Sequence, residues 1–296
     1  MSSTKKRLRS LLTARAAIPV PGVANALTAR IVEDVGFAAL YVSGAAIANT
    51  FLGAPDIGLT SLNEVAAHVG AIRDAVDLPL IVDADTGFGN ISNTWRTVRV
   101  LERAGADCIQ LEDQTFPKRC GHFNGKSVIS MEEMVDKIGA ACEAREDPDL
   151  LIIARTDARA EFGLAEACRR AKAYREAGAD ILFVEAPETE HEIEVIAAEL
   201  AGILVLNIVE GGITPALSID RVTELGFSIA LYANLPLLAG ILAVEETLRH
   251  LKNGSIGPRP PIATWEHRQN LVRRPWFEAL EDRYSKGQNT TSNSGR

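Results

Sequence analysis

One cysteine of this sequence lies in a polar loop, among groups that can hold or move a proton. Cys120 directly follows Lys118 and Arg119 and stands two residues before His122. Cationic neighbours stabilise a thiolate, whereas a structural cysteine usually has apolar neighbours. We therefore interpret Cys120 as a candidate acid–base group, with a nucleophilic role as the alternative. The other cysteines lie in strand-like or helix-like patterns and are predicted to be core residues: Cys108, Cys142 and Cys168.

A second set of candidate groups follows short apolar runs along the chain. These residues are Tyr41, Ser43, Asp83, Asp85, Glu112, Asp113, Arg155, Asp157, Glu185, Asn207 and Glu210. A single acid after a strand can cap the next helix, and this alternative stays open for Asp113 and Asp157. Acids at several neighbouring strand ends would repel one another unless a cation or protons lay between them. Because oxygen ligands of this kind suit Mg²⁺ or Mn²⁺, we predict a divalent metal site.

Eight apolar runs are predicted to be strands that hold these groups in place. They span 18–22, 38–44, 78–85, 108–113, 150–157, 181–186, 203–208 and 228–235. Their apolarity is continuous rather than alternating, as expected of parallel strands buried on both faces, and helical patterns lie between them. Eight such units in about 250 residues predict an α/β fold, a (β/α)8 TIM barrel, whose strand ends converge on one face. An open doubly wound sheet is the alternative, but no GxGxxG turn follows the first run.

The composition of the 296-residue chain argues against several classes of partner. The net charge is −8 and no basic stripe is present, so nucleic acid is not expected as a partner. The four cysteines are widely spaced without a CxxC pair, which fits a reducing compartment and no disulfide framework. No apolar run has the length needed to cross a bilayer, so no membrane partner is expected.

The two ends of the chain differ in character. The basic N-terminus predicts an amphipathic helix with Leu8, Leu11 and Leu12 on one face, and a mitochondrial leader is the alternative. A cytoplasmic location is therefore favoured over the mitochondrial matrix. Residues 1–284 are predicted to form one barrel domain with terminal helices. Residues 285–296 are polar and are predicted to be a disordered tail.

The motifs around these groups resemble those of the isocitrate lyase/phosphoenolpyruvate mutase superfamily. The matching segments are "YVSG" (41–44), "PDIGL" (55–59), "VDADTGFG" (82–89), "EDQ" (112–114) and "KRCGH" (118–122). The last is a specific signature of the carbon–carbon lyase branch, and the similarity runs from about Val20 to beyond Pro215. The resemblance implies a TIM barrel that commonly forms a homotetramer, a dimer of dimers that exchange terminal helices. Residues 262–284 are the candidate exchanged segment; an ordinary intrachain helix is the alternative.

The resemblance also implies roles for individual residues. Asp85 would bind Mg²⁺ directly, and the residues that hold its water shell would be Asp56, Asp83 and Glu112. A substrate carboxylate would be bound by the amides and hydroxyl around Ser43, Gly44 and Ala45 and clamped by Arg155. The other members of the substrate-binding set would be Asp85, Gly121, Glu185, Asn207 and Glu210, with Asn207 and Glu210 completing the polar wall and Glu185 supporting it. Cys120 would protonate carbon with support from Lys118, Arg119 and His122, although His122 and Arg119 are also candidates for binding the second carboxylate. The base for the hydroxyl proton stays open among Tyr41, Glu112 and a metal-bound water. Residues 117–130 would form a gate over the substrate.

The reaction implied by the resemblance is retro-aldol cleavage of a 2-hydroxy dicarboxylate to a 2-oxo acid and a carboxylate. Residues 184–187 and 209–212 resemble those of lyases that split 2-alkylmalates such as 2,3-dimethylmalate. Lyases for 2-methylisocitrate typically carry phenylalanine where this chain has Gly211, and this change is predicted to remove a bulky wall. A 2-methylisocitrate lyase that gives pyruvate and succinate is the alternative. An alternative of another class is a barrel that binds a dicarboxylate without turnover.

Overall fold

The computed structural model describes residues 3–14, 16–119, 121, 125, 127–254 and 261–285. Cys120 and His122 lie outside the described residues, as do residues 286–296 of the predicted tail. The chain divides into two compact units, Met1–Gly240 and Ile241–Arg296. In the described part of the chain, no helix has the length and apolarity needed to span a membrane.

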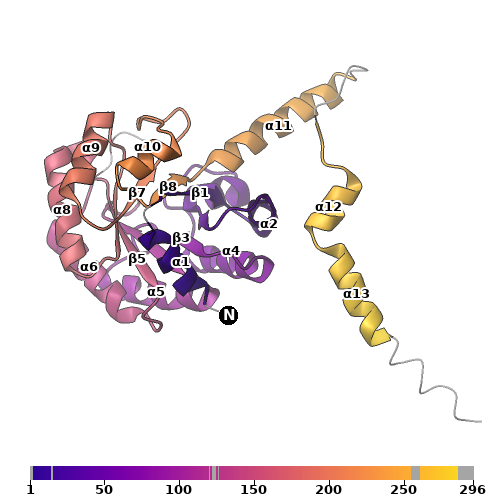
Figure 1. The fold of residues 1–296 in the computed structure, drawn as a ribbon, viewed down its shortest axis with the longest axis horizontal. Coiled ribbons are helices and arrows are strands. Elements are labelled where there is room, and N and C mark those ends of the chain that lie inside the picture. Colours follow the sequence, from indigo (N-terminus) through magenta and orange to yellow (C-terminus); the bar gives the residue numbers. More distant parts are fainter. Residues whose placement is uncertain are drawn as a thin grey trace, which may run out of the picture. The chain divides into compact units, whose positions relative to one another are not determined.

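A closed barrel of eight parallel strands forms the centre of the first unit, within its described residues (Figure 1). The strands are β1 (Ile18–Val23), β2 (Leu40–Val42), β3 (Leu80–Asp83), β4 (Cys108–Glu112), β5 (Leu151–Thr156), β6 (Ile181–Val184), β7 (Ile203–Asn207) and β8 (Ile229–Tyr232). Each strand pairs with the next, and β8 closes the barrel by pairing Ile229 with Ile18 of β1. The predicted TIM barrel is therefore confirmed, and each strand lies within or against its predicted run.

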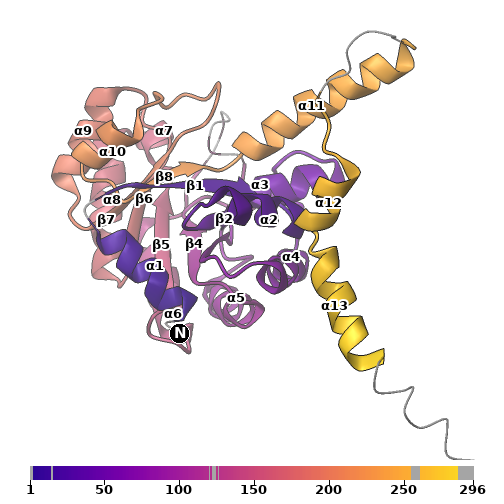
Figure 2. The same cartoon turned by 45° about the vertical axis from the view of Figure 1, so that its right-hand side comes forward.

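Helices connect the strands and cover the outside of the barrel, as Figure 2 shows for α4, α5, α6 and α8. The bounds are α1 (Thr4–Thr13), α2 (Ala26–Val35), α3 (Gly44–Ile47), the π-helix η1 (Ala48–Leu52), α4 (Leu62–Ala75), α5 (Ile91–Ala104), α6 (Met131–Ala144), α7 (Arg159–Phe162), α8 (Leu164–Glu176), α9 (Glu190–Glu199), α10 (Ile219–Glu224) and α11 (Leu235–Lys252). Local sequence fixes several ends. Ser61 and Glu64 form a reciprocal capping box at the start of α4. Gly105 ends α5 with φ 108°, a conformation that costs glycine little.

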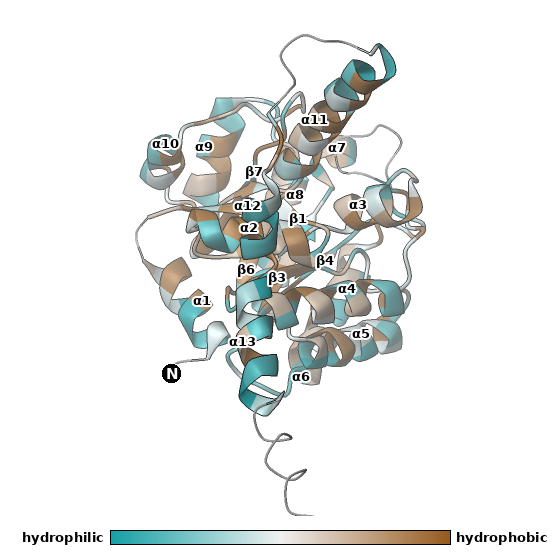
Figure 3. Ribbon diagram, turned by 90° about the vertical axis from the view of Figure 1, so that its right-hand side faces the viewer, coloured by the Kyte–Doolittle hydropathy of each residue, from teal (hydrophilic) through white to brown (hydrophobic). Residues whose placement is uncertain are grey.

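The core has two layers, and this explains the continuous apolarity of the strands. In β5, Leu151 and Ile153 point into the barrel, whereas Ile152 and Ala154 pack against the surrounding helices. Successive side chains of a strand point to opposite faces, so both sets must be apolar. Leu8 and Leu12 of α1 join the inner layer, which agrees with the predicted amphipathic helix. Figure 3 shows both apolar and polar residues along α5, as expected of a helix that buries only one face.

The described part of the second unit contains the rest of α11 and two shorter helices. These are α12 (Trp265–Leu271) and α13 (Arg274–Ser285), and Thr264 caps α12 by accepting the backbone N–H of His267. Leu271 is buried, whereas Trp265, Trp276 and Phe277 each expose more than half of their surface. Packing of this segment on a partner, helix exchange and the homotetramer stay predictions.

Candidate active site

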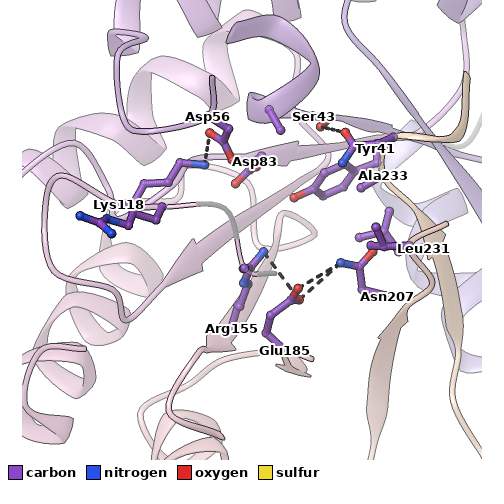
Figure 4. Close-up of a pocket in the computed structure, with 15 residues that line it drawn as sticks. Tyr41, Ser43, Asp56, Asp83, Lys118, Arg155, Glu185, Asn207, Leu231 and Ala233 are labelled. Atoms are coloured by element: carbon purple, nitrogen blue, oxygen red, sulfur yellow. Dashed lines mark hydrogen bonds and ion pairs between the residues drawn. The ribbon is translucent and has the colours of Figure 1, made fainter. Parts of the chain in front are cut away.

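A pocket lies at the carboxyl ends of the barrel strands, where the sequence predicts the site (Figure 4). The space between its lining atoms, part of it open to solvent, is about 440 Å³. Most of its lining residues are predicted ones: Tyr41, Ser43, Ala45, Asp56, Asp83, Lys118, Arg119, Gly121, Arg155, Glu185 and Asn207. The residues that complete the lining were not predicted: Val209, Leu231, Ala233 and Asn234.

The carboxylates that end β3 lie against the start of α3. Asp83 Oδ2 accepts the backbone N–H of Gly44 at 3.3 Å. Asp83 Oδ1 accepts the backbone N–H of Asp85 and the Nε2 amide of Gln110, each at 3.2 Å. Asp85 has a left-handed backbone, with φ 47°, which is uncommon for a residue other than glycine and often marks a functional site. A Cβ atom on Gly44 would lie 3.1 Å from Asp83 Oδ2, so the close approach favours glycine.

Lys118 forms buried ion pairs with two of the predicted metal-site acids. Its Nζ lies 2.5 Å from Asp56 Oδ1 and 2.9 Å from Asp85 Oδ1, and only 4% of Lys118 is exposed. Burial lowers the pKa of Lys118, but the surrounding carboxylates, Asp85 first among them, raise it well above its ordinary value. Burial raises the pKa of Asp85 to about 6, against the opposing effect of Lys118 and with a further increase from Asp83. Lys118 is therefore a charged partner of these acids.

The acidic cluster has oxygen donors that suit a divalent ion. Glu112 Oε1 is buried and has no hydrogen-bond partner among the described residues, and Asp85 Oδ1 faces the Lys118 ammonium. Among the described residues, no three His, Cys, Asp or Glu side chains are arranged as a ready metal cage. Mg²⁺ usually keeps several waters and takes one or two carboxylates, so it does not need such a cage. The donor set therefore fits a water-rich Mg²⁺ site.

Arg155 of β5 is a buried cation that faces three carboxylates. Its Nε and Nη2 donate to Asp157 Oδ2 and Oδ1 at 2.9 and 3.1 Å, a bidentate contact. Its Nε lies 3.4 Å from Glu112 Oε2, and its Nη1 lies 3.7 Å from Glu185 Oε2. The guanidinium carbon also lies 5.2 Å from the centre of the Phe183 ring. Burial lowers the pKa of Arg155, but the carboxylates raise it well above its ordinary value. A substrate carboxylate would meet a fixed positive charge here.

Two further predicted groups are held by neighbours in the pocket. Asn207 Nδ2 donates to the Glu185 carboxylate at 3.3 and 3.4 Å. Ser43 Oγ accepts the backbone N–H of Ala46 at 3.2 Å and lies 3.5 Å from Asn234 Oδ1. Figure 4 shows Glu185 between Arg155 and Asn207. The predicted polar residues after β2, β5, β6 and β7 therefore meet around one space.

Two predictions concern residues near the end of β7, and the placement of Glu210 differs from the one expected. Glu210 is exposed and is not among the residues that line the pocket. Gly211 has φ 70° in a turn in which the Gly212 N–H donates to Val209 O, and a Cβ atom there would contact nothing within 4 Å. The glycine therefore serves the turn, and its part in opening a substrate-facing wall stays a prediction. The side chain that reaches the pocket is that of Val209.

Comparisons with known proteins place this chain among enzymes of one family. Residues 8–252 match the family described as phosphoenolpyruvate phosphomutase. A 2,3-dimethylmalate lyase from Eubacterium barkeri is 40% identical over 287 residues, covering 96% of this chain and 99% of that protein. A 2-methylisocitrate lyase from Aeropyrum pernix is 47% identical over 244 residues, covering 82% of this chain and 78% of that protein.

Solved structures give the same picture of the fold. A crystal structure of 2,3-dimethylmalate lyase has a TM-score of 0.88 and 32% identity, covering 100% of this chain and 99% of that chain. A phosphonopyruvate hydrolase complex with oxalate and Mg²⁺ has a TM-score of 0.86 and 32% identity, covering 96% and 99% of the two chains. The second structure holds a small dicarboxylate and the metal that the donor set of this chain fits.

Proposed function

We propose a reaction from the premise that this chain belongs to the phosphoenolpyruvate mutase/isocitrate lyase superfamily and is an enzyme of the carbon–carbon lyase type. The reaction is the Mg²⁺-dependent retro-aldol cleavage of a 2-alkylmalate such as 2,3-dimethylmalate. The observation that carries this proposal is the division of the pocket lining into a charged part and an apolar part. Arg155, Glu185 and Asn207 supply the first, and Leu231 and Ala233 supply the second.

Each part of this lining suits one part of a 2-alkylmalate. Arg155 has five N–H groups, and Asp157 accepts two of them, so the remaining N–H groups, of which Nη1 also lies 3.7 Å from Glu185 Oε2, are the ones that would bind a substrate carboxylate. An alkyl group on the substrate would lie against the side chains of Leu231, Ala233 and Val209, which have no polar atoms that the alkyl group could leave without a hydrogen bond. When bound, Mg²⁺ would supply positive charge that stabilises the developing alkoxide of the substrate. We assign its binding to Asp85 directly and to Asp56, Asp83 and Glu112 through water.

Glu112 is our candidate for the base that takes the hydroxyl proton. Within the described residues its Oε1 is buried and has no hydrogen-bond partner, and burial raises the pKa of Glu112 well above its ordinary value, so this carboxylate has an increased affinity for a proton. Burial and Asp83 raise the pKa of Tyr41 well above its ordinary value, which disfavours the phenolate that a Tyr41 base would need. Removal of the proton allows the C2–C3 bond to break, and its electron pair forms an enolate on the departing carboxylate.

Cys120 is our candidate for the acid that protonates C3 of this enolate. Both of its chain neighbours, Arg119 and Gly121, line the pocket. The thiol proton would form the new C–H bond, and Arg119 would stabilise the thiolate that is left. The products of 2,3-dimethylmalate are then pyruvate and propanoate. Solvent exchange at Glu112 and Cys120 would restore the starting protonation.

Cleavage of 2-methylisocitrate is the second candidate. The 47% identity with a 2-methylisocitrate lyase supports it. A tricarboxylate also needs one more cation than a malate does, and Arg119 lies in the pocket lining where it could meet the third carboxylate. The two candidates therefore differ in whether Arg119 acts on the substrate or on Cys120.

A substrate panel separates these candidates. Purified enzyme with Mg²⁺ would be given 2,3-dimethylmalate, 2-ethyl-3-methylmalate, 2-methylisocitrate or oxaloacetate, and the 2-oxo acid product would be measured. We expect an alkylmalate to have the highest kcat/KM, and activity to be lost on chelation of the metal. Cys120→Ser should remove turnover, whereas Cys142→Ser, which changes a thiol in α6, should retain it. Preference for 2-methylisocitrate would contradict the primary proposal, and full activity of Cys120→Ser would contradict the role of the thiol.

A further inference from the structure

A buried carboxylate that takes no part in the proposed reaction lies directly behind the site. Asp113 follows Glu112 at the end of β4, and its side chain is fully buried. Its Oδ1 accepts the backbone N–H of Asp157 at 2.9 Å. Its Oδ2 accepts the hydroxyls of Thr156 and Tyr174, both at 2.7 Å, and Arg170 Nη1 at 3.2 Å. The alternative that Asp113 caps a helix is wrong, because its oxygens bind these groups instead.

Asp157 connects the Asp113 carboxylate to Arg155, our candidate for binding a substrate carboxylate, which we call the Arg155 clamp. The backbone N–H that Asp113 accepts belongs to Asp157, whose carboxylate holds Arg155 in the bidentate contact. The Asp113 N–H also donates to the Arg155 carbonyl at 3.3 Å. A shift of Asp113 would therefore move both the backbone of Arg155 and the partner of its guanidinium.

Asp113 and Arg170 also form hydrogen bonds with the loop that brings Lys118, Arg119 and Gly121 to the pocket. Arg170 Nη1 donates to the Ile129 carbonyl at 2.8 Å, and the Ile129 N–H donates to the Asp113 carbonyl at 2.8 Å. The paired stem of this loop begins one residue further along, where Gln114 and Val128 form an antiparallel bridge. The stem therefore starts and ends on the hydrogen bonds of Asp113 and Arg170.

We propose that Asp113, Arg170 and Tyr174 are positioning residues that fix the Arg155 clamp and the loop stem relative to each other. This inference rests on the proposed function, because it takes the pocket as a dicarboxylate site. A buried carboxylate with four donors has little freedom to move, and the cost of leaving any donor unpaired keeps the network in one arrangement. Dicarboxylate affinity therefore depends on groups of α8 that do not touch the ligand.

Arg170→Lys is the sharpest test, because the chain has a matched control. Arg145 Nη1 bridges Asp180 Oδ2 and the Leu150 carbonyl, both at 2.9 Å, at the amino ends of β5 and β6. Arg145→Lys therefore removes the same kind of contact at the other end of the barrel. Tyr174→Phe removes a single hydroxyl of the network and keeps the ring.

The readout is the dissociation constant of oxalate in the presence of Mg²⁺, with amide hydrogen exchange and urea unfolding measured on the same proteins. We expect Arg170→Lys to weaken oxalate binding on the order of tenfold, below the hundredfold that a 1 Å misplacement can cost. Tyr174→Phe should have a smaller effect in the same direction, and Arg145→Lys should leave affinity unchanged.

Amide hydrogen exchange should accelerate at residues 127–130 and 155–158 in Arg170→Lys alone. On a cleaved substrate, KM should rise while kcat stays near the wild-type value.

Equal losses of affinity in Arg170→Lys and Arg145→Lys would overturn the inference, since they would indicate general destabilisation. A stability loss with unchanged oxalate affinity and unchanged exchange at 155–158 would overturn it as well. Neither readout needs turnover, so the proposed lyase reaction can fail on its substrate panel while the positioning network is supported. If wild-type protein binds no oxalate, the exchange pattern alone decides between the two outcomes.

Discussion

Replacement of Arg155 by lysine tests the carboxylate clamp while keeping its charge. The guanidinium makes two hydrogen bonds to Asp157 and lies near Glu112 and Glu185 in a site where only 8% of Arg155 is exposed. A lysine ammonium is a point charge and cannot reproduce the planar, bidentate contact. The substitution therefore changes the geometry of the site more than its net charge.

The expected magnitude follows from the contacts that are lost. A hydrogen bond between charged groups contributes about 1.5–3 kcal/mol, so loss of one bond to Asp157 should lower the free energy of unfolding by about 2 kcal/mol. Loss of one bond to the substrate carboxylate should weaken oxalate binding roughly thirtyfold, since each 1.4 kcal/mol is about tenfold. Arg155→Met should be worse, by about 3–5 kcal/mol, because it leaves buried carboxylates without their cation.

The pH dependence of Arg155→Met gives an independent check. The arginine holds down the pKa of Glu112, so its removal raises that pKa further above the unfolded value. The folded state then binds the extra proton, and the stability deficit should be smaller at pH 5 than at pH 8. Arg155→Lys should show much less of this dependence.

Urea unfolding at the two pH values and calorimetric titration with oxalate and Mg²⁺ measure these effects. Arg221→Lys is the control, because Arg221 donates to Glu190 and Glu194 in a solvent-exposed cluster of α9 and α10 that has no contact with Arg155 or Arg170 among the described residues. The control should leave both stability and oxalate affinity unchanged. Wild-type oxalate affinity in Arg155→Lys would refute the assignment of Arg155 as the clamp.

Three further predictions concern other parts of the site. Because burial raises the pKa of Asp85 to about 6, above the roughly 3.9 of an unfolded aspartate, the unfolding free energy of metal-free protein should fall as pH rises between these values. Asp85→Asn should flatten that slope in urea titrations, and an unchanged slope would contradict the assignment. Gly121→Ala should reduce kcat/KM by at least about a hundredfold, because a Cβ atom there would overlap Arg155 and Glu185; near-normal turnover would contradict this placement. Leu231→Ala should shift kcat/KM toward larger 2-alkyl groups by roughly tenfold for each methylene added to the substituent, and an unchanged preference across an alkyl series would show that Leu231 does not face the substituent.

The barrel could be predicted from the sequence because its signal is repeated in every strand. In β5, both the inward Ile153 and the outward Ile152 are buried, so apolar residues run without interruption and reveal a strand covered on both faces. Polar residues then follow at the carboxyl end, as Arg155 does here. The topology brings these ends together, so the sequence also predicted most of the pocket lining.

The remaining features of the site depend on the three-dimensional arrangement of the chain, which the order of residue types does not reveal. Leu231 and Ala233 look like ordinary strand residues, and only the closing of β8 against β1 turns them toward the pocket. The pairing of Lys118 with Asp56 joins two loops that are far apart in the sequence. Gly211 lies in a turn with a positive φ, and a glycine can serve such a turn as well as open a wall, so its residue type alone does not assign its role.

Cleavage of 2,3-dimethylmalate in D₂O with Mg²⁺ is the most direct test of the proposed reaction. Protonation of an enolate by an exchangeable thiol predicts pyruvate and propanoate in equal amounts, with one deuterium at C2 of the propanoate. Cys142→Ser should give the same products, and Cys120→Ser should give neither at an appreciable rate. Cleavage that leaves propanoate without deuterium, or that yields other products, would contradict the retro-aldol reaction.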